Sequence, residues 1–345
     1  MNVLVIDSYD DHYHNQFNDI HIKALVATNN NVIIAGRCNH YGEHIEKIVH
    51  KVINIPSCLY CKRYTKGIRV FFSRVFDVIR LIYLNAIIKK ANIDRIVFIR
   101  YDIMTIPFFV TLKKVYLINH QTANDLENSI KNIILKIMPK NYIHIALNET
   151  IKEYIISKLP NRNVITIPHG LLSSFNVSDT INYSNLYGER IIFCSATSSV
   201  DAELLQQIIE SEKVSQYLVR QNINLLIKSK CTFNKKSNIY SIDGFIDKDV
   251  YQWLIKKSIA VFLPYNKSFG YRVSGVFFEC VANNTAVITS NIDAFKSYKT
   301  NQQPIHCIND ELDFINSIES ILCQNKVWNK SEFDPIPYWV NVLKK

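Results

Sequence analysis

Ile259–Ser290 reads IAVFLPYNKSFGYRVSGVFFECVANNTAVITS, and this stretch decides how the second half of the chain folds. The apolar run that ends at Pro264 predicts a buried strand, and a polar loop follows over 265–274. The run after Gly275 has the spacing of a helix, and Ala286–Ser290 predicts a second buried strand. Strand, loop, helix and strand in this order indicate a parallel α/β sheet.

The loop and the first helical turn carry side chains suited to a nucleotide. Ser274 is predicted to cap the helix, and the remaining amides of the helix start attract an anion. Gly275 lets another group approach the backbone closely, and Arg272 adds a positive charge nearby. Glu279 follows one turn later, where its carboxylate can accept two hydrogen bonds from a ribose diol. The combination predicts a sugar-nucleotide site.

This segment resembles the C-terminal nucleotide-binding signature of GT-B glycosyltransferases, and of glycosyltransferase family 4 in particular. In that signature a Gly-rich loop opens a helix that bears a Glu, as Ser274, Gly275 and Glu279 do here. Two positions depart from the signature. Eight positions before Glu279, where the family usually has a first Glu, this chain has Tyr271. Before the strand, where the family usually has Gly-Xaa-Pro, residues 284–286 are Asn-Thr-Ala. The resemblance implies two Rossmann-like domains that face a cleft. The change at Tyr271 leaves open whether the anomeric configuration is retained or inverted.

Two further segments of the second half resemble the same enzymes. Ile239–Tyr265 has the family's order of strand, Gly, helix and Leu-Pro-Tyr. This resemblance implies that Gly244 and Phe245 meet the base and that Tyr265 belongs to the donor site. Lys228, at the end of a predicted strand, resembles the Lys or Arg that binds the donor phosphates, although the family's Arg-x-x-x-x-Lys-Gly signature is missing.

The chain has 345 residues, enough for two domains of ordinary size. Residues 171–187 are rich in Ser and Asn, lack periodicity, and separate two halves in which strands and helices alternate. We therefore expect an acceptor-binding domain over 1–170, a linker over 171–187 and a nucleotide-sugar domain over 188–330. The resemblance implies that the helix over 331–345 packs back toward the first domain.

The net charge of +10 is concentrated in the first half of the chain. Residues 1–170 hold 22 Lys and Arg against 13 Asp and Glu, whereas residues 171–345 hold 18 against 17. Nucleic acid and anionic membrane are the usual partners of such a surface, but no nucleic-acid recognition motif is found. Lys62–Lys90 sets basic residues beside aromatic and aliphatic ones and predicts a helix that contacts an anionic membrane. Simple packing of this helix on the sheet is the alternative.

Several classes of protein and site are disfavoured. No apolar run is long enough to span a membrane, and the N-terminus lacks the pattern of a signal peptide, so a cytoplasmic protein is expected. No Gly-x-Gly-x-x-Gly follows the first strand, which argues against a dehydrogenase. Cys58 and Cys61 form the one Cys-x-x-Cys among eight scattered cysteines, so reduced structural thiols are expected. Without an Asp-x-Asp run, neither a metal nor another cofactor is expected.

Polar residues follow the first predicted strand, 2–7. Ligands of a parallel sheet bind at the carboxyl ends of its strands, so these residues are placed to contact one. The loop after this strand includes Asp11, His12, His14 and Asn15. We expect Asp11 to act in catalysis and the other three to contact the acceptor. An ordinary solvated loop is the alternative.

Asp102 and His120 follow two further predicted strands, 95–100 and 115–118. A neutral His at such a position can hydrogen-bond a sugar hydroxyl or take its proton, and a carboxylate such as Asp102 can orient it. GT-B enzymes are similar in this respect and often have a functional His in the N-terminal domain. We therefore expect catalytic roles for His120 and Asp102, with a structural His as the alternative.

Taken together, these features predict a metal-independent glycosyltransferase. It would move a sugar from a nucleoside diphosphate sugar to a hydroxyl of a saccharide acceptor that is lipid-linked, in cell-surface polysaccharide synthesis at the inner membrane face. Nucleic acid is not an expected partner. Two alternatives stay open: a sugar-nucleotide epimerase on the same fold, and a catalytically silent GT-B module that binds a sugar nucleotide or a partner.

Overall fold

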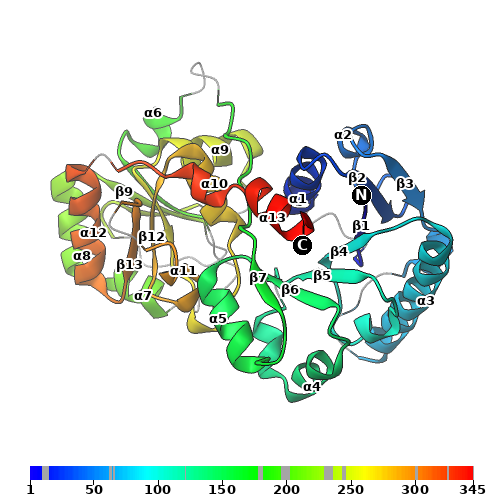
Figure 1. Cartoon of the computed structure of the whole chain (residues 1–345). Helices are drawn as coiled ribbons and strands as arrows, with labels where there is room; N and C mark the ends of the chain where they lie inside the picture. The colour runs from blue at the N-terminus through cyan, green and yellow to red at the C-terminus, as the bar shows by residue number, and fades with distance from the viewer. Residues whose placement is uncertain are drawn as a thin grey trace. The chain divides into compact units, whose positions relative to one another are not determined.

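All strand pairs among the described residues are parallel, in a computed structural model of the chain (Figure 1). The chain divides into two units, Met1–Gly170 with Phe333–Lys345, and Leu171–Glu332, and each unit contains one sheet. The structure describes residues 1–9, 15–61, 64, 67–120, 122–177, 182–195, 203–228, 236–242, 246–299, 302–324 and 326–344.

The first unit is built on a seven-stranded sheet with the order β3-β2-β1-β4-β5-β6-β7. Its strands are β1 Asn2–Asp7, β2 Asn31–Gly36, β3 Lys51–Asn54, β4 Arg95–Arg100, β5 Lys114–Ile118, β6 Tyr142–Ala146 and β7 Val164–Thr166. The central strands are almost wholly buried, because helices cover both faces of the sheet. The chain runs outward from β1 to β3 and returns to β4, so the carboxyl ends of β1 and β4 form a switch point of the kind at which ligands bind.

Helices connect these strands. They are α1 Asn15–Ala27, α2 Glu43–Glu46, α3 Ile68–Lys90, α4 Ser129–Ile137, α5 Glu149–Lys158 and α13 Ile336–Lys344, with the short 3-10 helices η1 Ser57–Leu59, η2 Ile106–Phe108 and η3 Asn124–Glu127. Right-handed crossovers put α3, α4 and α5 on one face of the sheet and α1 and α2 on the other. Residues 124–137 form two helices, η3 and α4, and not one continuous helix. Asn128 adopts an extended conformation there and its side chain accepts from the amide of Lys131 at 3.2 Å, which starts α4 as a new helix.

The C-terminal helix α13 is part of the first unit's core. Trp339 is fully buried, and its Nε1 donates to Nδ1 of His21 on α1 at 3.2 Å. Gly170 has φ +84°, and a Cβ there would lie 2.2 Å from Cγ2 of Ile20 on α1, so only glycine fits this position. Helix α1 thus contacts both Gly170, at the end of the 1–170 segment, and the C-terminal helix α13.

The second unit is built on a six-stranded sheet with the order β10-β9-β8-β11-β12-β13. Its strands are β8 Ile191–Cys194, β9 Asn224–Lys228, β10 Ile239–Ile242, β11 Ala260–Leu263, β12 Ala286–Ser290 and β13 Ile305–Ile308. Its helices are α6 Ser184–Tyr187, α7 Glu203–Glu210, α8 Glu212–Gln221, α9 Lys248–Lys257, α10 Gly275–Asn283, α11 Asp293–Lys296 and α12 Glu311–Cys323, with η4 Lys267–Phe269 and η5 Lys330–Phe333. The predicted α/β class and the predicted order of strand, loop, helix and strand over 259–290 are confirmed.

Asn284 stands where the glycosyltransferase signature that the sequence resembles has a Gly. It ends α10 in the left-handed conformation, with φ +59°. The amides at this helix end donate back to the carbonyls of Cys280 and Val281. Asn is one of the few residues other than Gly that adopt this conformation readily, so Asn284 can end the helix where the family has Gly.

Candidate functional site

The start of α10 is capped by a side chain and open to a ligand. Ser274 is buried, and its Oγ accepts from the amide of Phe277 at 3.1 Å, which confirms the predicted N-cap. Tyr265 comes from the other end of the loop, and its hydroxyl lies 2.7 Å from Ser274 Oγ. Gly275 opens the helix, and a Cβ built there would meet nothing within 4 Å. The helix start therefore combines unpaired amides, partial positive charge and free space, as an anion site requires.

Glu279 is held in place one turn farther along α10. Its Oε2 accepts from the hydroxyl of Tyr251 on α9 at 2.6 Å. Burial raises the pKa of Glu279, and the hydrogen bond from Tyr251 opposes that rise. Tyr251 thus fixes a partly buried carboxyl group near the helix start. The sequence analysis missed Tyr251, because its partner lies 28 residues away on another helix.

The strand register brings three more polar side chains to the edge of the sheet near α10. Ile227 of β9 pairs with Cys194 of β8, so the residues that follow, Lys228 and Ser195, lie next to each other at the carboxyl edge. Ser290 ends β12 at the same edge. The hydroxyls of Ser195 and Ser290 are buried and have no hydrogen-bond partner among the described residues. Buried hydroxyls are ordinarily paired, so this edge is suited to a polar ligand.

The loop between β11 and α10 is anchored by aromatic residues. The rings of Tyr265 and Phe269 stack with centroids 4.1 Å apart. Tyr271 donates its hydroxyl to Oδ2 of Asp293 at 2.9 Å. Arg272 is exposed beside these anchored residues. The loop therefore holds a cationic side chain near the helix start, while Tyr271 is engaged by a carboxylate.

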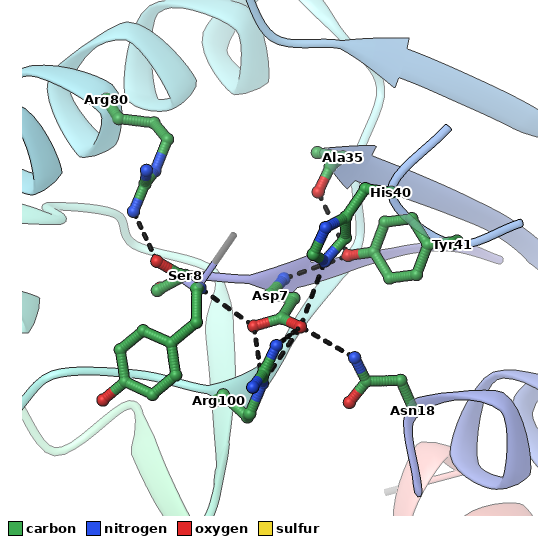
Figure 2. A network of polar contacts seen from close by, with 9 residues as sticks. Asp7, Ser8, Asn18, Ala35, His40, Tyr41, Arg80 and Arg100 are labelled. Atoms are coloured by element: carbon green, nitrogen blue, oxygen red, sulfur yellow. Dashed lines mark hydrogen bonds and ion pairs between the residues drawn. The ribbon is translucent and has the colours of Figure 1, made fainter. Parts of the chain in front are cut away.

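A buried ion pair lies at the switch point of the first unit (Figure 2). Arg100, the last residue of β4, donates from Nε to Oδ1 of Asp7 at 2.9 Å and from its terminal nitrogen to Oδ2 at 2.6 Å. Asn18 on α1 donates to Asp7 Oδ2 at 2.7 Å, and His40 Nε2 lies 3.2 Å from the same oxygen. Burial raises the pKa of Asp7, but the hydrogen bond with His40 and the charge of Arg100 outweigh it and hold the pKa below its usual value.

This network fixes the backbone from which the polar loop of the first unit departs. Arg80 on α3 donates to the carbonyl of Ser8, and its guanidinium lies 4.5 Å from the ring centroid of Tyr60. The amide of Tyr9 donates to Oδ1 of Asp7 at 2.9 Å. The sequence analysis missed this network. Opposite charges at the last positions of two buried strands, Asp7 and Arg100, were the signal that could have revealed it.

Asp102 and His120 both lie at the carboxyl edge of the first sheet and are both buried. Asp102 accepts from the amide of Met104 at 2.9 Å and from Nε of Arg74 at 3.3 Å. The ring of His120 packs against Phe17 of α1, with centroids 4.3 Å apart. Met104 and Arg74 thus hold the carboxylate of Asp102, and Phe17 packs on the ring of His120.

Phe17 is surrounded by histidines. Besides His120, it contacts the rings of His21 and His169, with centroid distances of 4.6 and 4.7 Å. Burial lowers the pKa of His21 to about 3, and His169 adds to this effect. The cluster therefore holds His21 neutral at physiological pH.

The remaining predicted site residues are only partly covered. Asn15 is the first residue of α1. Asp11, His12, His14, Gly244 and Phe245 lie outside the described residues. Over the ranges that the structure describes, no group of three or more His, Cys, Asp and Glu is placed to bind a metal ion. Within the same ranges, none of the helices has the length and apolar character needed to cross a bilayer.

The whole chain is similar to several solved structures. The alignment with sucrose-phosphate synthase from Thermosynechococcus elongatus covers 99% of this chain and 94% of the synthase, with a TM-score of 0.61 and 12% sequence identity. The alignment with HepE from Anabaena, crystallised with UDP-glucose, covers 100% of this chain and 98% of HepE, with a TM-score of 0.58 and 10% sequence identity. The alignment with UDP-GlcNAc 2-epimerase from Methanocaldococcus jannaschii covers 100% of this chain and 99% of the epimerase, with a TM-score of 0.56 and 12% sequence identity.

No family model matches the sequence, and no curated protein matches it. The structural similarity covers both units and both parallel sheets. The chain therefore has the GT-B fold, an α/β architecture of two Rossmann-like units.

Proposed function

We propose that the chain is a glycosyltransferase that takes its sugar from a nucleoside diphosphate sugar bound by the second unit. The observation that carries this proposal is the construction of α10. Ser274 caps the helix, the space at Gly275 is open, and Tyr251 holds Glu279 one turn later. An open helix start is suited to an anion such as a diphosphate, and a carboxylate one turn away is suited to a ribose diol, which supports this proposal. HepE, a protein of the same fold, is crystallised with UDP-glucose, which supports the choice of donor.

In the proposed reaction the acceptor hydroxyl attacks the anomeric carbon as the bond from that carbon to the diphosphate oxygen breaks. The free amides at the start of α10 stabilise the negative charge that develops on the diphosphate, with Arg272 and Lys228 contributing positive charge. Gly244, Phe245 and Tyr265 complete the proposed donor site. The reaction as proposed uses neither a metal nor another cofactor.

The first unit is the proposed acceptor side. His12, His14 and Asn15 contact the acceptor in this scheme. His120, Asp102 and Asp11 are the proposed catalytic groups, of which one accepts the hydroxyl proton. His120 is suited to this role by its position at the carboxyl end of β5, where ligands of parallel sheets bind.

The acceptor that we propose is a lipid-linked saccharide in cell-surface polysaccharide synthesis, at the inner face of a membrane. The excess of basic residues in 1–170 supports this choice, because anionic lipid attracts such a surface. In this proposal the protein is peripheral and contacts the membrane through 62–90, of which the structure describes α3 and two preceding positions, 64 and 67.

A sugar-nucleotide epimerase is the second candidate, because the similar structures include UDP-GlcNAc 2-epimerase. A catalytically silent module that binds the donor is the third. The three differ in turnover: an epimerase converts the donor without an acceptor, a silent module binds the donor unchanged, and a glycosyltransferase consumes it when an acceptor is present.

The test combines binding with turnover. The protein is screened for thermal stabilisation by UDP, GDP, CMP, TDP and their common sugars, since a ligand at 100 times its dissociation constant stabilises by about 2.7 kcal/mol. The stabilising donor is then incubated with and without a lipid extract as acceptor, and the products are separated. Sugar transferred to lipid supports the proposal. Epimerised donor, or unchanged donor with every extract, contradicts it.

A further inference from the structure

Helix α3 has two apolar faces, and only one of them packs on the sheet. Leu81, Leu84 and Ile88 are buried on the inner face. The opposite face also carries apolar side chains at helical spacing, and these are exposed: Ile68, Phe71, Phe72, Val75, Ile79 and Ile82. Phe71 and Phe72 are 64% and 54% exposed. A helix on a protein surface ordinarily shows polar side chains to water, so a continuous apolar stripe there indicates an interaction site.

Helix α4 repeats this arrangement on the same face of the sheet. Its inner side buries Leu135, while Ile130, Ile133 and Ile137 form an outward stripe and are 62%, 57% and 74% exposed. The spacing of these three isoleucines, at i, i+3 and i+7, puts them on one side of the helix. Two helices of the first unit thus present apolar side chains to solvent.

Residues 108–112, which begin at the last residue of η2, are hydrogen-bonded to α3 and to a residue that follows α4. Phe108, Val110 and Leu112 are exposed, and the side-chain amide of Asn85 on α3 donates to the carbonyl of Phe108 at 3.1 Å. On the other side, the amide of Asn141, a few residues after α4, donates to the carbonyl of Thr111 at 2.9 Å. Figure 1 shows α3 and α4 in the same unit, both outside the strands. We call the outward faces of α3 and α4 together with 108–112 the α3–α4 surface.

The charges of the α3–α4 surface are almost all positive. Asp77 is the one acidic residue within 68–90, 103–114 and 129–140, and it pairs with Arg80 at 2.6 Å. Six basic side chains in these ranges are exposed: Arg69, Lys89, Lys90, Lys113, Lys136 and Lys140. A second copy of the chain would bring the same positive charges against these, which is unfavourable. Apolar side chains among exposed cations match instead the boundary between acyl chains and anionic headgroups.

We propose that the α3–α4 surface docks on an anionic lipid bilayer, with Phe71, Phe72 and the α4 isoleucines entering the headgroup region and the basic residues contacting lipid phosphates. This extends the membrane contact of the proposed function from one helix to a surface of three segments. It rests on the membrane contact of the proposed function, and its test uses neither donor nor acceptor. Failure of vesicle binding therefore removes the membrane contact alone, whereas the donor site of α10 is tested separately.

The experiment is co-sedimentation of the full chain with two kinds of vesicle, phosphatidylcholine alone and a mixture with phosphatidylglycerol. The test variant combines Phe71→Ser with Ile133→Ser. The control variant combines Leu186→Ser with Leu312→Ser, which changes two equally exposed apolar residues of the second unit, 70% and 62% exposed. Because all four side chains are exposed, neither variant disturbs a core. Mass by light scattering is measured for each protein in solution.

The wild type and the control are expected to bind the anionic vesicles, less so as salt rises, and the test variant to bind them at least tenfold more weakly. A second pair isolates charge. Lys89→Gln with Lys90→Gln is expected to lower the affinity about fivefold for each charge, whereas Lys248→Gln with Lys257→Gln is expected to leave it unchanged. Equal vesicle binding by the test variant and the control, or no binding by the wild type, overturns the proposal. So does a wild-type dimer that dissociates in the test variant, because the occupant is then a second copy.

Discussion

The hydroxyl of Tyr251 donates to Oε2 of Glu279 across 2.6 Å and so joins α9 to α10 at the proposed ribose-binding carboxylate. A carboxylate that must accept two hydrogen bonds from a diol needs a fixed orientation, and Tyr251 supplies it. In the proposed donor site, Tyr251 is therefore a positioning residue.

Tyr251→Phe is expected to weaken donor binding by about tenfold, because the freed carboxylate loses its orientation. The cost to the free energy of unfolding should be only about 1 kcal/mol, since one hydrogen bond is lost. Tyr217→Phe is the matched control, because the hydroxyl of Tyr217 has no partner among the described residues. Calorimetric titration with the donor measures both variants. Equal donor affinity for the two would remove Tyr251 from the site.

Ser274→Ala is expected to lower the free energy of unfolding by about 1 kcal/mol through loss of the α10 cap, and to weaken donor binding as well. Ser211→Ala removes a cap of the same kind from α8, where Ser211 Oγ accepts from the amide of Val214 at 3.2 Å. The two variants should be similarly destabilised, but only the first should bind the donor less tightly. If both bind it equally well, the start of α10 is a structural feature alone.

Asp7→Asn is expected to destabilise the protein by roughly 3–5 kcal/mol, because it leaves the buried guanidinium of Arg100 without its counter-charge. The double variant Asp7→Leu with Arg100→Met should lose much less, since both charges are gone. The pKa of Asp7 is lowered in the folded state, so its contribution is present above pH 4 and is lost as the pH falls through the folded-state pKa. Urea unfolding at neutral and acid pH measures these differences. If Asp7→Asn is as stable as the double variant, the carboxylate of Asp7 is not the counter-charge that Arg100 needs.

The buried histidines are expected to make stability fall in mild acid. Burial lowers the pKa of His21 to about 3 and that of His144 to about 4, against 6.5 in the unfolded chain. The unfolded state therefore binds more protons below pH 6.5, and each histidine should cost about 1.4 kcal/mol of stability per pH unit between roughly pH 6 and 4.

His21→Asn tests this dependence, because its side-chain oxygen can still accept from Trp339 while its charge no longer changes with pH. Urea unfolding at a series of pH values should give a shallower slope for this variant than for the wild type. His50→Asn is the control, since His50 is exposed. Parallel slopes for the wild type and His21→Asn would mean that His21 is protonated in the folded state.

The local pattern of the sequence predicts much of the fold. Over 259–290 the strand, cap, helix and strand follow from apolar period and from Ser274, which are properties of neighbouring residues. The contacts of Glu279 and Asp7 could not be predicted in the same way. Their partners lie 28 and 93 residues away, and which strand ends meet depends on the strand order of each sheet. Apolar side chains lie on both faces of α3, so the sequence pattern of this helix could not predict which face packs on the sheet.

The measurement that tests the central claim most directly is donor binding by Gly275→Asp, compared with wild type and with Gly275→Asn. The space at Gly275 is open, and Asp is favourable in the first turn of a helix, so this variant should fold with unchanged or higher stability. A carboxylate at the helix start would repel the diphosphate, so the donor affinity should fall at least a hundredfold, and by much less in the neutral Asn variant. Wild-type affinity for a nucleoside diphosphate sugar in Gly275→Asp would contradict a donor site at the start of α10.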